Sequence, residues 1–544
     1  MSDHKDRDIP LLLKTEWAAG VVLTLLILYL HYVFMQNAGG LWRDEVHSVQ
    51  LATMPSLSSL WAAMRFDSFP ILFTLVVRLW AGIGWGETDT GLRLLGLLAG
   101  SSIIGAAWLN ARLIRRSTPI IFLFLFGFSS LTIRFGDSIR PYGLGIMLIL
   151  LASGLIWSVV ESPAPLKVLA AAAVSALSVQ CLYTNAVLLF AICLGGIAVA
   201  LYNGMWKRAA LVVGIGIAAA LSLLPYLGMI RRSSEWSVLV QYPNTFKQSW
   251  EVLSRHSLGS AGALVFWLWC GLFLSGIFLA VYRVSSRSGA GASRRERDMA
   301  VFFTTAMVVS TAAFFLLFKF MKVTPHPWYF LSPMAIAAVS LDALFGMDRR
   351  PWRALRVALA VLVVGLTLNT VGHRVMIRQT NTDLIAEELG KTASKDDLIL
   401  ISPWYVGITF QRYYKGAAPW TTIPPMEDLS VVRYDLLKEK MISPYLLSPV
   451  FKDIDDTLDR GGRLWLVGNF YSRYDPETGQ LPFVLPPAPN GPYGWRNGPY
   501  LRSWSMQTEY FIYSRASQLK QLPPAGDKAI NPYEKSSIVV VEGR

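Results

Sequence analysis

The stretch that decides the fold lies near the start of the chain and reads WAAGVVLTLLILYLHYVFMQ over residues 17–36. Its length is what an α-helix needs to cross roughly 30 Å of hydrocarbon at about 1.5 Å per residue. Lys5, Arg7 and Lys14 precede it, as basic residues do in a secretory signal. The run is longer than the apolar part of such a signal. It therefore predicts a first transmembrane helix that is not cleaved off.

Similar apolar runs continue from this first helix to residue 372. They lie at 69–85, 91–111, 118–133, 141–160, 166–182, 184–202, 209–229, 261–283, 299–319, 327–346 and 352–372. Of the 544 residues, 53% are hydrophobic and only 16% are charged, which is too apolar for a soluble multidomain chain. The fold class predicted is a polytopic α-helical membrane protein.

The formal net charge of +14 does not indicate a nucleic-acid partner. Lys and Arg occur mostly in short loops between apolar runs, where they set membrane topology, rather than on one basic face. The three cysteines, Cys181, Cys193 and Cys270, all lie inside apolar runs. Neither a disulfide nor a cysteine metal site is therefore expected. The lipid bilayer is the partner that the composition predicts.

The basic clusters decide which apolar runs cross the bilayer. They lie at 112–116, 207–208, 283–297 and 349–356. If every run crossed from a cytoplasmic N-terminus, all four clusters would lie outside, against the positive-inside rule. Treating 69–85, which holds Pro70 and Arg78, as a surface helix returns all four to the cytoplasm. About eleven transmembrane helices are expected, and residues 37–90 form the first extracytoplasmic loop with its surface helices.

The chain changes character after residue 372. Strand-like runs lie at 397–402, 463–467, 510–514 and 537–541, with turn signals at Gly461-Gly462 and Asn490-Gly491. Residues 1–372 are therefore expected to form the transmembrane domain, and 373–544 a soluble α/β domain. Eleven crossings from an inside N-terminus place this second domain outside the cell membrane.

Carboxylates gather in the first outer loop. Asp44 and Glu45 directly follow the first span, and Asp67 lies in the second half of the loop. Carboxylates beside a low-dielectric boundary bind protons more tightly, which suits one of them to take a proton from an attacking hydroxyl. For the adjacent pair, a solvated loop without chemistry is the plain alternative. The hypothesis is a catalytic base at the outer surface, acting on a donor whose leaving group is held in the lipid.

A histidine in this loop leaves a metal site open. His47 lies three residues after Asp44, so the two share one face of a helix and, with Glu45, could hold a divalent cation such as Mg²⁺ or Mn²⁺. The spacing is a weak signal. A hydrogen-bonding or solvated histidine is the favoured alternative.

Basic residues near the outer ends of spans are the candidates for binding a donor phosphate. A phosphate leaving group needs fixed cations because charge develops on its oxygens as the glycosidic bond breaks. The candidates are Arg93, Arg140, Lys319 and Lys322. Each could instead extend its charge to lipid headgroups, as long basic side chains do at span ends. Arg140 is favoured because it shares a short loop with Asp137 and directly precedes Pro141-Tyr142.

Several of these motifs resemble a known family. Asp44-Glu45-Val46-His47, Asp67-Ser68-Phe69-Pro70 and Gly86-Glu87 followed by Arg93-Leu94 are similar to the first outer loop of GT-C-fold glycosyltransferases. The branch resembled is that of the protein O-mannosyltransferases (glycosyltransferase family 39-like) and lipid A aminoarabinose transferases. Arg140-Pro141-Tyr142 and Trp328-Tyr329-Phe330-Leu331-Ser332-Pro333 are similar to later elements of that family.

The resemblance implies a function and roles for named residues. It implies inverting transfer of a hexose or mannose-like sugar from a polyprenyl-phosphate donor to a hydroxyl of a glycan, glycolipid or protein, on the outer face of the cell inner (plasma) membrane. Asp44 would be the base, and Tyr142, His326 and Tyr329 would contact the substrate.

Two departures from the family pattern qualify this implication. Ser68-Phe69-Pro70 replaces a His-Pro-Pro element, and Trp328 stands where an arginine is expected. A transporter or flippase of lipid-linked sugars is the alternative function. A non-catalytic membrane scaffold is the third.

Overall fold

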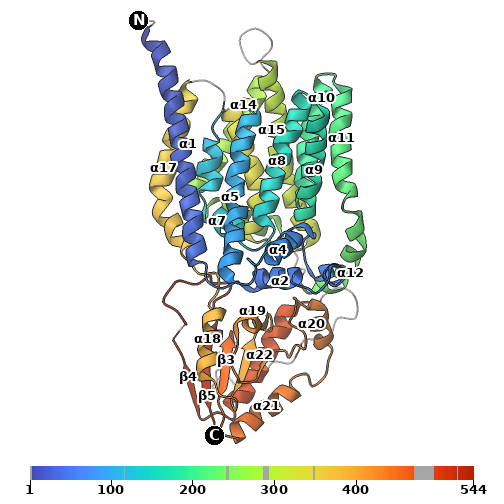
Figure 1. Ribbon diagram of the computed structural model, residues 1–544, viewed down its shortest axis with the longest axis vertical. Helices are drawn as coiled ribbons and strands as arrows, with labels where there is room; N and C mark the ends of the chain where they lie inside the picture. Colours follow the sequence, from blue (N-terminus) through green and yellow to red (C-terminus); the bar gives the residue numbers. More distant parts are fainter. Residues whose placement is uncertain are drawn as a thin grey trace. The chain divides into compact units, whose positions relative to one another are not determined.

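The computed structural model describes residues 3–114, 117–240, 244–285, 293–346, 350–470, 485, 495–523 and 525–543. Arg115, Arg116, Arg287, Arg349 and the Asn490-Gly491 turn, all used above, lie outside these residues. The chain forms two compact units (Figure 1). The membrane unit comprises Met1–Gln36, Phe69–Leu227 and Pro243–Met376, and the sheet unit comprises Asn37–Ser68, Gly228–Tyr242 and Ile377–Arg544.

The membrane unit is built from apolar helices that run alongside one another (Figure 1). Its long helices are α1 (Asp3–Asn37), α5 (Asp89–Ile114), α8 (Tyr142–Glu161), α9 (Pro165–Cys181), α10 (Asn185–Tyr202), α11 (Trp206–Leu221), α14 (Ala263–Ser285), α15 (Arg294–Met321), α16 (Leu331–Phe345) and α17 (Arg350–Val375). Nine helical stretches of the described chain are long and apolar enough to cross a bilayer. The protein is therefore a multi-pass membrane protein, and the expected count of about eleven spans is approximate.

Short elements connect the long helices of the membrane unit. They are α4 (Leu72–Gly82), α6 (Ile120–Phe122), the π-helix η2 (Leu123–Gly127), α7 (Ser130–Gly136), η3 (Leu224–Tyr226), α13 (Phe246–Glu251), the π-helix η5 (Val252–Leu258) and η6 (Pro327–Phe330). At about 1.5 Å per residue, the eleven residues of α4 cover only roughly half of a 30 Å hydrocarbon layer. The helix in segment 69–85 is therefore too short to cross the bilayer, as expected of a helix that lies on the membrane surface.

Polar contacts gather four helix ends at one end of the bundle. Arg295 at the start of α15 pairs with Glu161 at the end of α8 and donates to the carbonyl of Ile114, the last residue of α5, at 2.7 Å. Arg208 at the start of α11 donates to the carbonyl of Val160 at 2.7 Å. Three of the basic clusters that were expected to share one side of the membrane therefore meet at one end of the helices.

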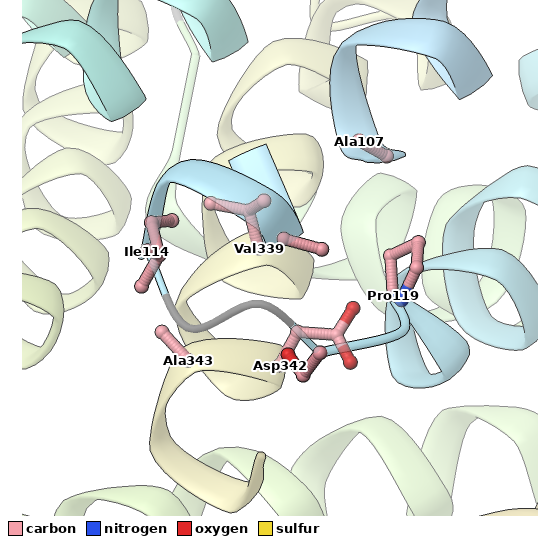
Figure 2. A pocket seen from close by; sticks show the side chains of 8 residues that line it. Ala107, Ile114, Pro119, Val339, Asp342 and Ala343 are labelled. Carbon is pink, nitrogen blue, oxygen red and sulfur yellow. The ribbon is translucent and has the colours of Figure 1, made fainter. Parts of the chain in front are cut away.

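The run 118–133 does not form the single straight span that its composition predicts. It breaks into α6, η2 and α7 because a buried acid starts the first helix: Asp342 of α16 accepts hydrogen bonds from the amides of Ile121 at 2.9 Å and Phe122 at 2.8 Å. Figure 2 shows Asp342 beside Pro119, next to a cavity of about 10 Å³. The break turns the chain within the bundle and delivers α7 to the turn that precedes α8.

The sheet unit contains a five-stranded sheet in the order β2-β1-β3-β5-β4. Its strands are β1 (Leu398–Ser402), β2 (Trp420–Thr422), β3 (Leu464–Gly468), β4 (Gln518–Gln521) and β5 (Ser537–Glu542). β2, β1 and β3 are parallel, whereas β5 and β4 are antiparallel to their neighbours. β1 and β3 are buried along their whole length, which explains why they read as continuous apolar runs.

Helices and the first loop complete the sheet unit. They are α2 (Arg43–Ala52), α3 (Leu57–Ala63), η1 (Met64–Phe66), α12 (Leu227–Ser237), η4 (Val238–Val240), α18 (Thr382–Thr392), α19 (Val406–Tyr413), α20 (Tyr434–Met441), α21 (Ser448–Asp459) and α22 (Asn497–Tyr513). The expected division placed 37–68 and 228–242 with the transmembrane domain, whereas in the structure they pack with 377–544.

One predicted strand is wrong. Residues 510–513 form the last turn of α22 rather than a strand, and 514 follows the helix. Buried residues at Tyr500, Trp504, Thr508 and Ile512 recur every four residues and give the helix its apolar face. The alternation at its end is too short to compete with that longer pattern. β2 and β4, which are short, were not predicted.

Candidate functional site

Asp44 lies in the first turn of α2 in the sheet unit. Its carboxylate accepts a hydrogen bond from Nε of Arg43 at 2.9 Å, and about 28% of its side-chain surface is exposed. The Arg43 guanidinium lies over the ring of Tyr405, 4.6 Å from its centre. A first-turn acid is stabilised as an anion by the helix dipole. Asp44 therefore pairs with Arg43 at the start of α2 and keeps part of its side chain exposed.

Glu45, the neighbouring acid, is used differently. Its side chain is fully buried and accepts a hydrogen bond from the backbone amide of Trp42 at 3.2 Å. This bond is the half of a capping box in which the third helical residue caps the amide that precedes the helix; the Trp42 indole, which can only donate, cannot accept the return bond. The structure therefore gives Glu45 a role in holding α2 and, through it, Asp44.

His47 and Asp67 face each other within the sheet unit. His47 Nε2 lies 3.9 Å from Oδ1 of Asp67, and both side chains are about 4% exposed. The backbone amide of Val432 donates to Nδ1 of His47 at 3.2 Å. Since Nδ1 accepts, a neutral His47 carries its proton on Nε2, on the side of Asp67. His47 thus lies between the helix that carries Asp44 and the second acidic element of the loop.

The expected metal ligands do not form a metal site. Glu45 is committed to the Trp42 amide and His47 Nδ1 to the Val432 amide. Within the described part of the chain, no group of three or more His, Cys, Asp or Glu side chains is placed to hold a metal ion. As the described residues lie, Asp44, Glu45 and His47 are therefore not arranged as a metal site.

Glu534 is a member of this acidic group that the sequence did not reveal. Burial raises its pKa to about 7; the charge and backbone amide of Arg43 lower the pKa, whereas the charges of Asp44 and Glu45 raise it. For Arg43, burial lowers the pKa, but the charges of Asp44 and Glu534 outweigh it, so the net pKa is raised. Arg43 is thus shared by two carboxyl groups. No local pattern marks Glu534, because it reaches α2 from nearly 500 residues away.

Backbone hydrogen bonds fix the acidic loop to the rest of the sheet unit. The amide of Leu41 donates to the hydroxyl of Tyr413 at 2.6 Å, and that of Gln379 donates to the carbonyl of Ala38 at 2.8 Å. Gln50 Nε2 donates to the carbonyl of Leu429 at 3.3 Å. Residues 38–50 are therefore held at both ends, and the orientation of α2 depends on residues 377–544.

The membrane unit contains the predicted cations, two of which are deeply buried. Arg93 in α5 is 3% exposed, and Arg140, in the turn before α8, is 6% exposed. The Arg140 guanidinium lies 4.5 Å from the centre of the Phe69 ring, and Phe69 packs edge-on against Tyr142 at 5.6 Å. A flat aromatic surface therefore orients the Arg140 guanidinium inside the membrane unit.

Aromatic rings connect Arg140 with the other predicted substrate residues. Phe135 packs edge-on against Tyr142 and stacks on Trp328, with centroids 4.5 Å apart. His326 stacks on Trp328 at 4.5 Å and meets Tyr329 edge-on at 5.4 Å. Arg140, Tyr142, His326 and Tyr329 therefore belong to one continuous series of ring contacts. Trp328, which replaces the arginine of the family pattern, joins its two halves.

The two predicted lysines are placed less favourably. Lys319 and Lys322 are both exposed at the end of α15. Lys319 Nζ lies 4.7 Å from the centre of the Phe246 ring, and Lys322 ends the helix with a φ of 52°. Neither is enclosed as Arg93 and Arg140 are. Of the four predicted cations, Arg93 and Arg140 are therefore the buried ones.

Comparisons with known proteins bear on the fold. No family model matches the sequence, and no curated protein matches it. Among solved structures, the chain is similar to ArnT from Cupriavidus metallidurans in the apo state, with a TM-score of 0.57 and 11% identity over 97% of this chain and 98% of that one. The same protein bound to undecaprenyl phosphate gives a TM-score of 0.55 with the same identity and coverage. The described helices and the α/β portion together therefore have a GT-C fold.

A further similarity is too weak to support an argument. The oligosaccharyltransferase of Archaeoglobus fulgidus in its apo form gives a TM-score of 0.49 at 11% identity, over 84% of this chain and 69% of that one.

Proposed function

We propose that this protein is a membrane glycosyltransferase that moves a sugar from a polyprenyl-phosphate donor to a hydroxyl of an acceptor. The observation that carries the proposal is the likeness to ArnT, which spans nearly all of both chains and includes a structure bound to undecaprenyl phosphate. A shared fold does not by itself imply a shared reaction. The proposal therefore also draws on the partly exposed carboxylate of Asp44 in one unit and, in the other, on buried Arg93 and on buried Arg140 over the Phe69 ring.

Asp44 is the residue proposed as the general base. Of the three predicted acids, Glu45 caps its own helix and Asp67 is almost fully enclosed, whereas Asp44 keeps part of its surface exposed. The acceptor oxygen attacks the anomeric carbon, the bond from that carbon to the phosphate oxygen breaks, and the hydroxyl proton passes to Asp44. A single displacement of this kind inverts the configuration of the sugar carbon.

Arg140 and Arg93 are proposed to bind the phosphate of the donor. Negative charge grows on the phosphate oxygens as the leaving bond breaks, and fixed cations in a low-dielectric setting stabilise that charge without reorganising. Both arginines are buried in the membrane unit, which is the unit proposed to hold the lipid part of the donor. Tyr142, His326 and Tyr329 are proposed to line the path of the sugar.

The orientation and the substrates are proposed as follows. The N-terminus is cytoplasmic, and the acidic loop and residues 377–544 face the extracytoplasmic side of the inner membrane. The sugar is a hexose or mannose-like unit, and the acceptor is a glycan, a glycolipid or a protein hydroxyl. The positive-inside distribution of the basic clusters supports the orientation.

Sugar transfer in membranes tests the proposal. Labelled sugar from a panel of polyprenyl-phosphate donors is followed into cell-envelope acceptors, with the native chain or Asp44→Asn at matched expression. Loss of the base is expected to slow transfer about 100-fold or more. Asp455→Asn is the matched control, because Asp455 pairs with Arg515 on the surface of the same unit.

Three outcomes oppose the proposal. Equal transfer by the native chain and Asp44→Asn removes Asp44 as the base. Movement of the lipid-linked sugar across the bilayer without transfer replaces the enzyme with the transporter that the sequence left open. No transfer and no movement with any donor favours the scaffold.

A further inference from the structure

A buried ionisable pair lies in the membrane unit beside the proposed phosphate-binding arginines. His31 of α1 is fully buried, Asp137 is 1% exposed, and Nδ1 of the imidazole lies 2.6 Å from Oδ1 of the carboxylate. Ionisable side chains at membrane depth are costly, and they are retained where they serve a function. The mechanism proposed above uses neither residue.

The pair is fitted closely against α5. A methyl group built on Gly100 would lie 1.8 Å from Oδ1 of Asp137, and one on Gly96 would lie 2.0 Å from its carbonyl oxygen. Two glycines one turn apart therefore let the Asp137 segment lie directly against the helix backbone. Arg93, on the same helix, is close enough to act electrostatically on Asp137.

Asp137 begins the turn that carries Arg140. Residues 137–141 are all buried, and the turn is fixed at its other end, where the carbonyl of Pro141 accepts from the amide of Gly145 at 2.8 Å. Ser138 donates to the carbonyl of Phe135 at 2.8 Å. Any shift of Asp137 is therefore passed along a short, fully packed segment to the guanidinium three residues later.

We propose that the His31–Asp137 pair is a positioning pair, which anchors this turn to α1 and α5 and so holds Arg140 where it binds the donor phosphate. The inference rests on the proposed function and extends it to two residues that need not touch the substrate. A histidine bonded to a carboxylate is expensive to bury unless the geometry is needed. The geometry is needed here because the planar Arg140 guanidinium must lie over the Phe69 ring, and a small displacement would misalign its N–H donors.

The inference is tested by substitutions that distinguish loss of the His31–Asp137 hydrogen bond from loss of packing. His31→Leu removes the donor, and His31→Asn keeps an amide nitrogen near the position of Nδ1. His31→Leu combined with Asp137→Leu replaces the pair by apolar side chains, which restores packing without restoring the anchor. Asn110→Leu is the control: it removes a buried hydrogen bond to the carbonyl of Leu150, about 15 Å further along α5 than Gly100.

Two readouts are needed on the purified full-length chain: binding of undecaprenyl phosphate, and KM and kcat for sugar transfer. His31→Leu and the double variant are expected to weaken binding and raise the donor KM about tenfold or more, with a smaller change in kcat. His31→Asn is expected to recover to within about threefold of the native chain, and Asn110→Leu to bind like it.

The outcomes separate the inference from the function on which it rests. Native-like binding and KM in the folded double variant overturn the positioning role. An equal loss of binding in Asn110→Leu overturns it too, since the effect would then report general loosening of the bundle. If the native chain itself does not bind undecaprenyl phosphate, the proposed function fails first and the inference falls with it.

Discussion

The membrane unit and the sheet unit hold opposite charges by different means. In the membrane unit, Arg140 is buried with its guanidinium over the Phe69 ring, and Arg93 is buried close enough to Asp137 of the α7–α8 turn to act on it electrostatically. In the sheet unit, Asp44 and its neighbours are held by backbone amides, an arginine and a histidine. Cations are thus oriented by flat apolar surfaces and anions by N–H donors. Substitutions in the two units are therefore expected to fail in different ways.

The largest effect is expected for the buried cation. Arg140→Gln leaves Phe69 in place but removes the charge that faces the growing phosphate anion, so transfer should fall about 100- to 1,000-fold. The loss should appear in the donor KM as well as in kcat, measured in reconstituted membranes. Arg140→Lys, which keeps the charge without the planar fork, should recover only part of it. Unchanged kinetics in Arg140→Gln would move phosphate binding elsewhere.

The next effect concerns the stability of the acidic group. Burial raises the pKa of Glu534 to about 7, above its ordinary value of 4.5. In the unfolded chain Glu534 therefore loses its proton at a lower pH than in the folded chain. The contribution of Glu534 to the free energy of unfolding is complete below pH 4.5 and is lost as pH rises through 7. Glu534→Gln removes the ionisable group and with it this dependence of the free energy of unfolding on pH. At pH 8 the free energy of unfolding of the variant should exceed that of the native chain by at most ~3 kcal/mol, so the variant should unfold at a higher temperature. At pH 4.5 the two should unfold at the same temperature.

Unfolding of the purified chain followed by intrinsic fluorescence checks this expectation. A native chain that is more stable than Glu534→Gln at pH 8 would show instead that Arg43 holds Glu534 as an anion.

A smaller effect is expected for the histidine that links the two acidic elements. His47→Asn places an amide oxygen near Nδ1, so the Val432 amide keeps its acceptor and the fold keeps its stability. The N–H on the side of Asp67 is lost. Transfer should slow about tenfold, mainly in kcat, with an unchanged unfolding temperature. A large loss of stability would mean that His47 acts only in packing.

The smallest effect is expected for the exposed lysines of α15. Lys319→Gln and Lys322→Gln remove charges that solvent or headgroups already screen, so each should change transfer less than about threefold. Kinetics with the same donor as for Arg140→Gln make the comparison direct. A loss as large as that of Arg140→Gln would restore these lysines as the phosphate-binding residues.

Much of the membrane unit could be predicted because helix length and loop charge are local properties of the chain. The non-crossing segment 69–85 followed from the positions of distant basic clusters, and its helix is indeed too short to span. The break in 118–133 could not be predicted, because its cause, Asp342, lies more than 200 residues away. In the sheet unit, β1, β3 and β5 were predicted from their apolar runs, whereas 510–514 was wrong because the longer helical pattern of α22 prevails.

The candidate site was predictable in its residue types but not in its connections. Acids in the first loop and arginines at span ends stand out by position, and the structure gathers most of them within their own units. Glu534 and the amide of Val432 carry no local signal, since each is recognised only through the fold. His31 did carry one, an ionisable residue within an apolar run, but its partner Asp137 is 106 residues away.

The packing of residues 37–68 with residues 377–544 has a consequence for the order of events during synthesis. The ribosome makes the acidic loop early, but the tyrosine, carbonyl and amide groups that fix it come about 370 to 385 residues later. At about 5 to 20 residues per second, this leaves the loop without these partners for roughly 20 to 80 seconds while helices insert. A nascent chain released before these residues are made would therefore lack the groups that orient the acidic loop.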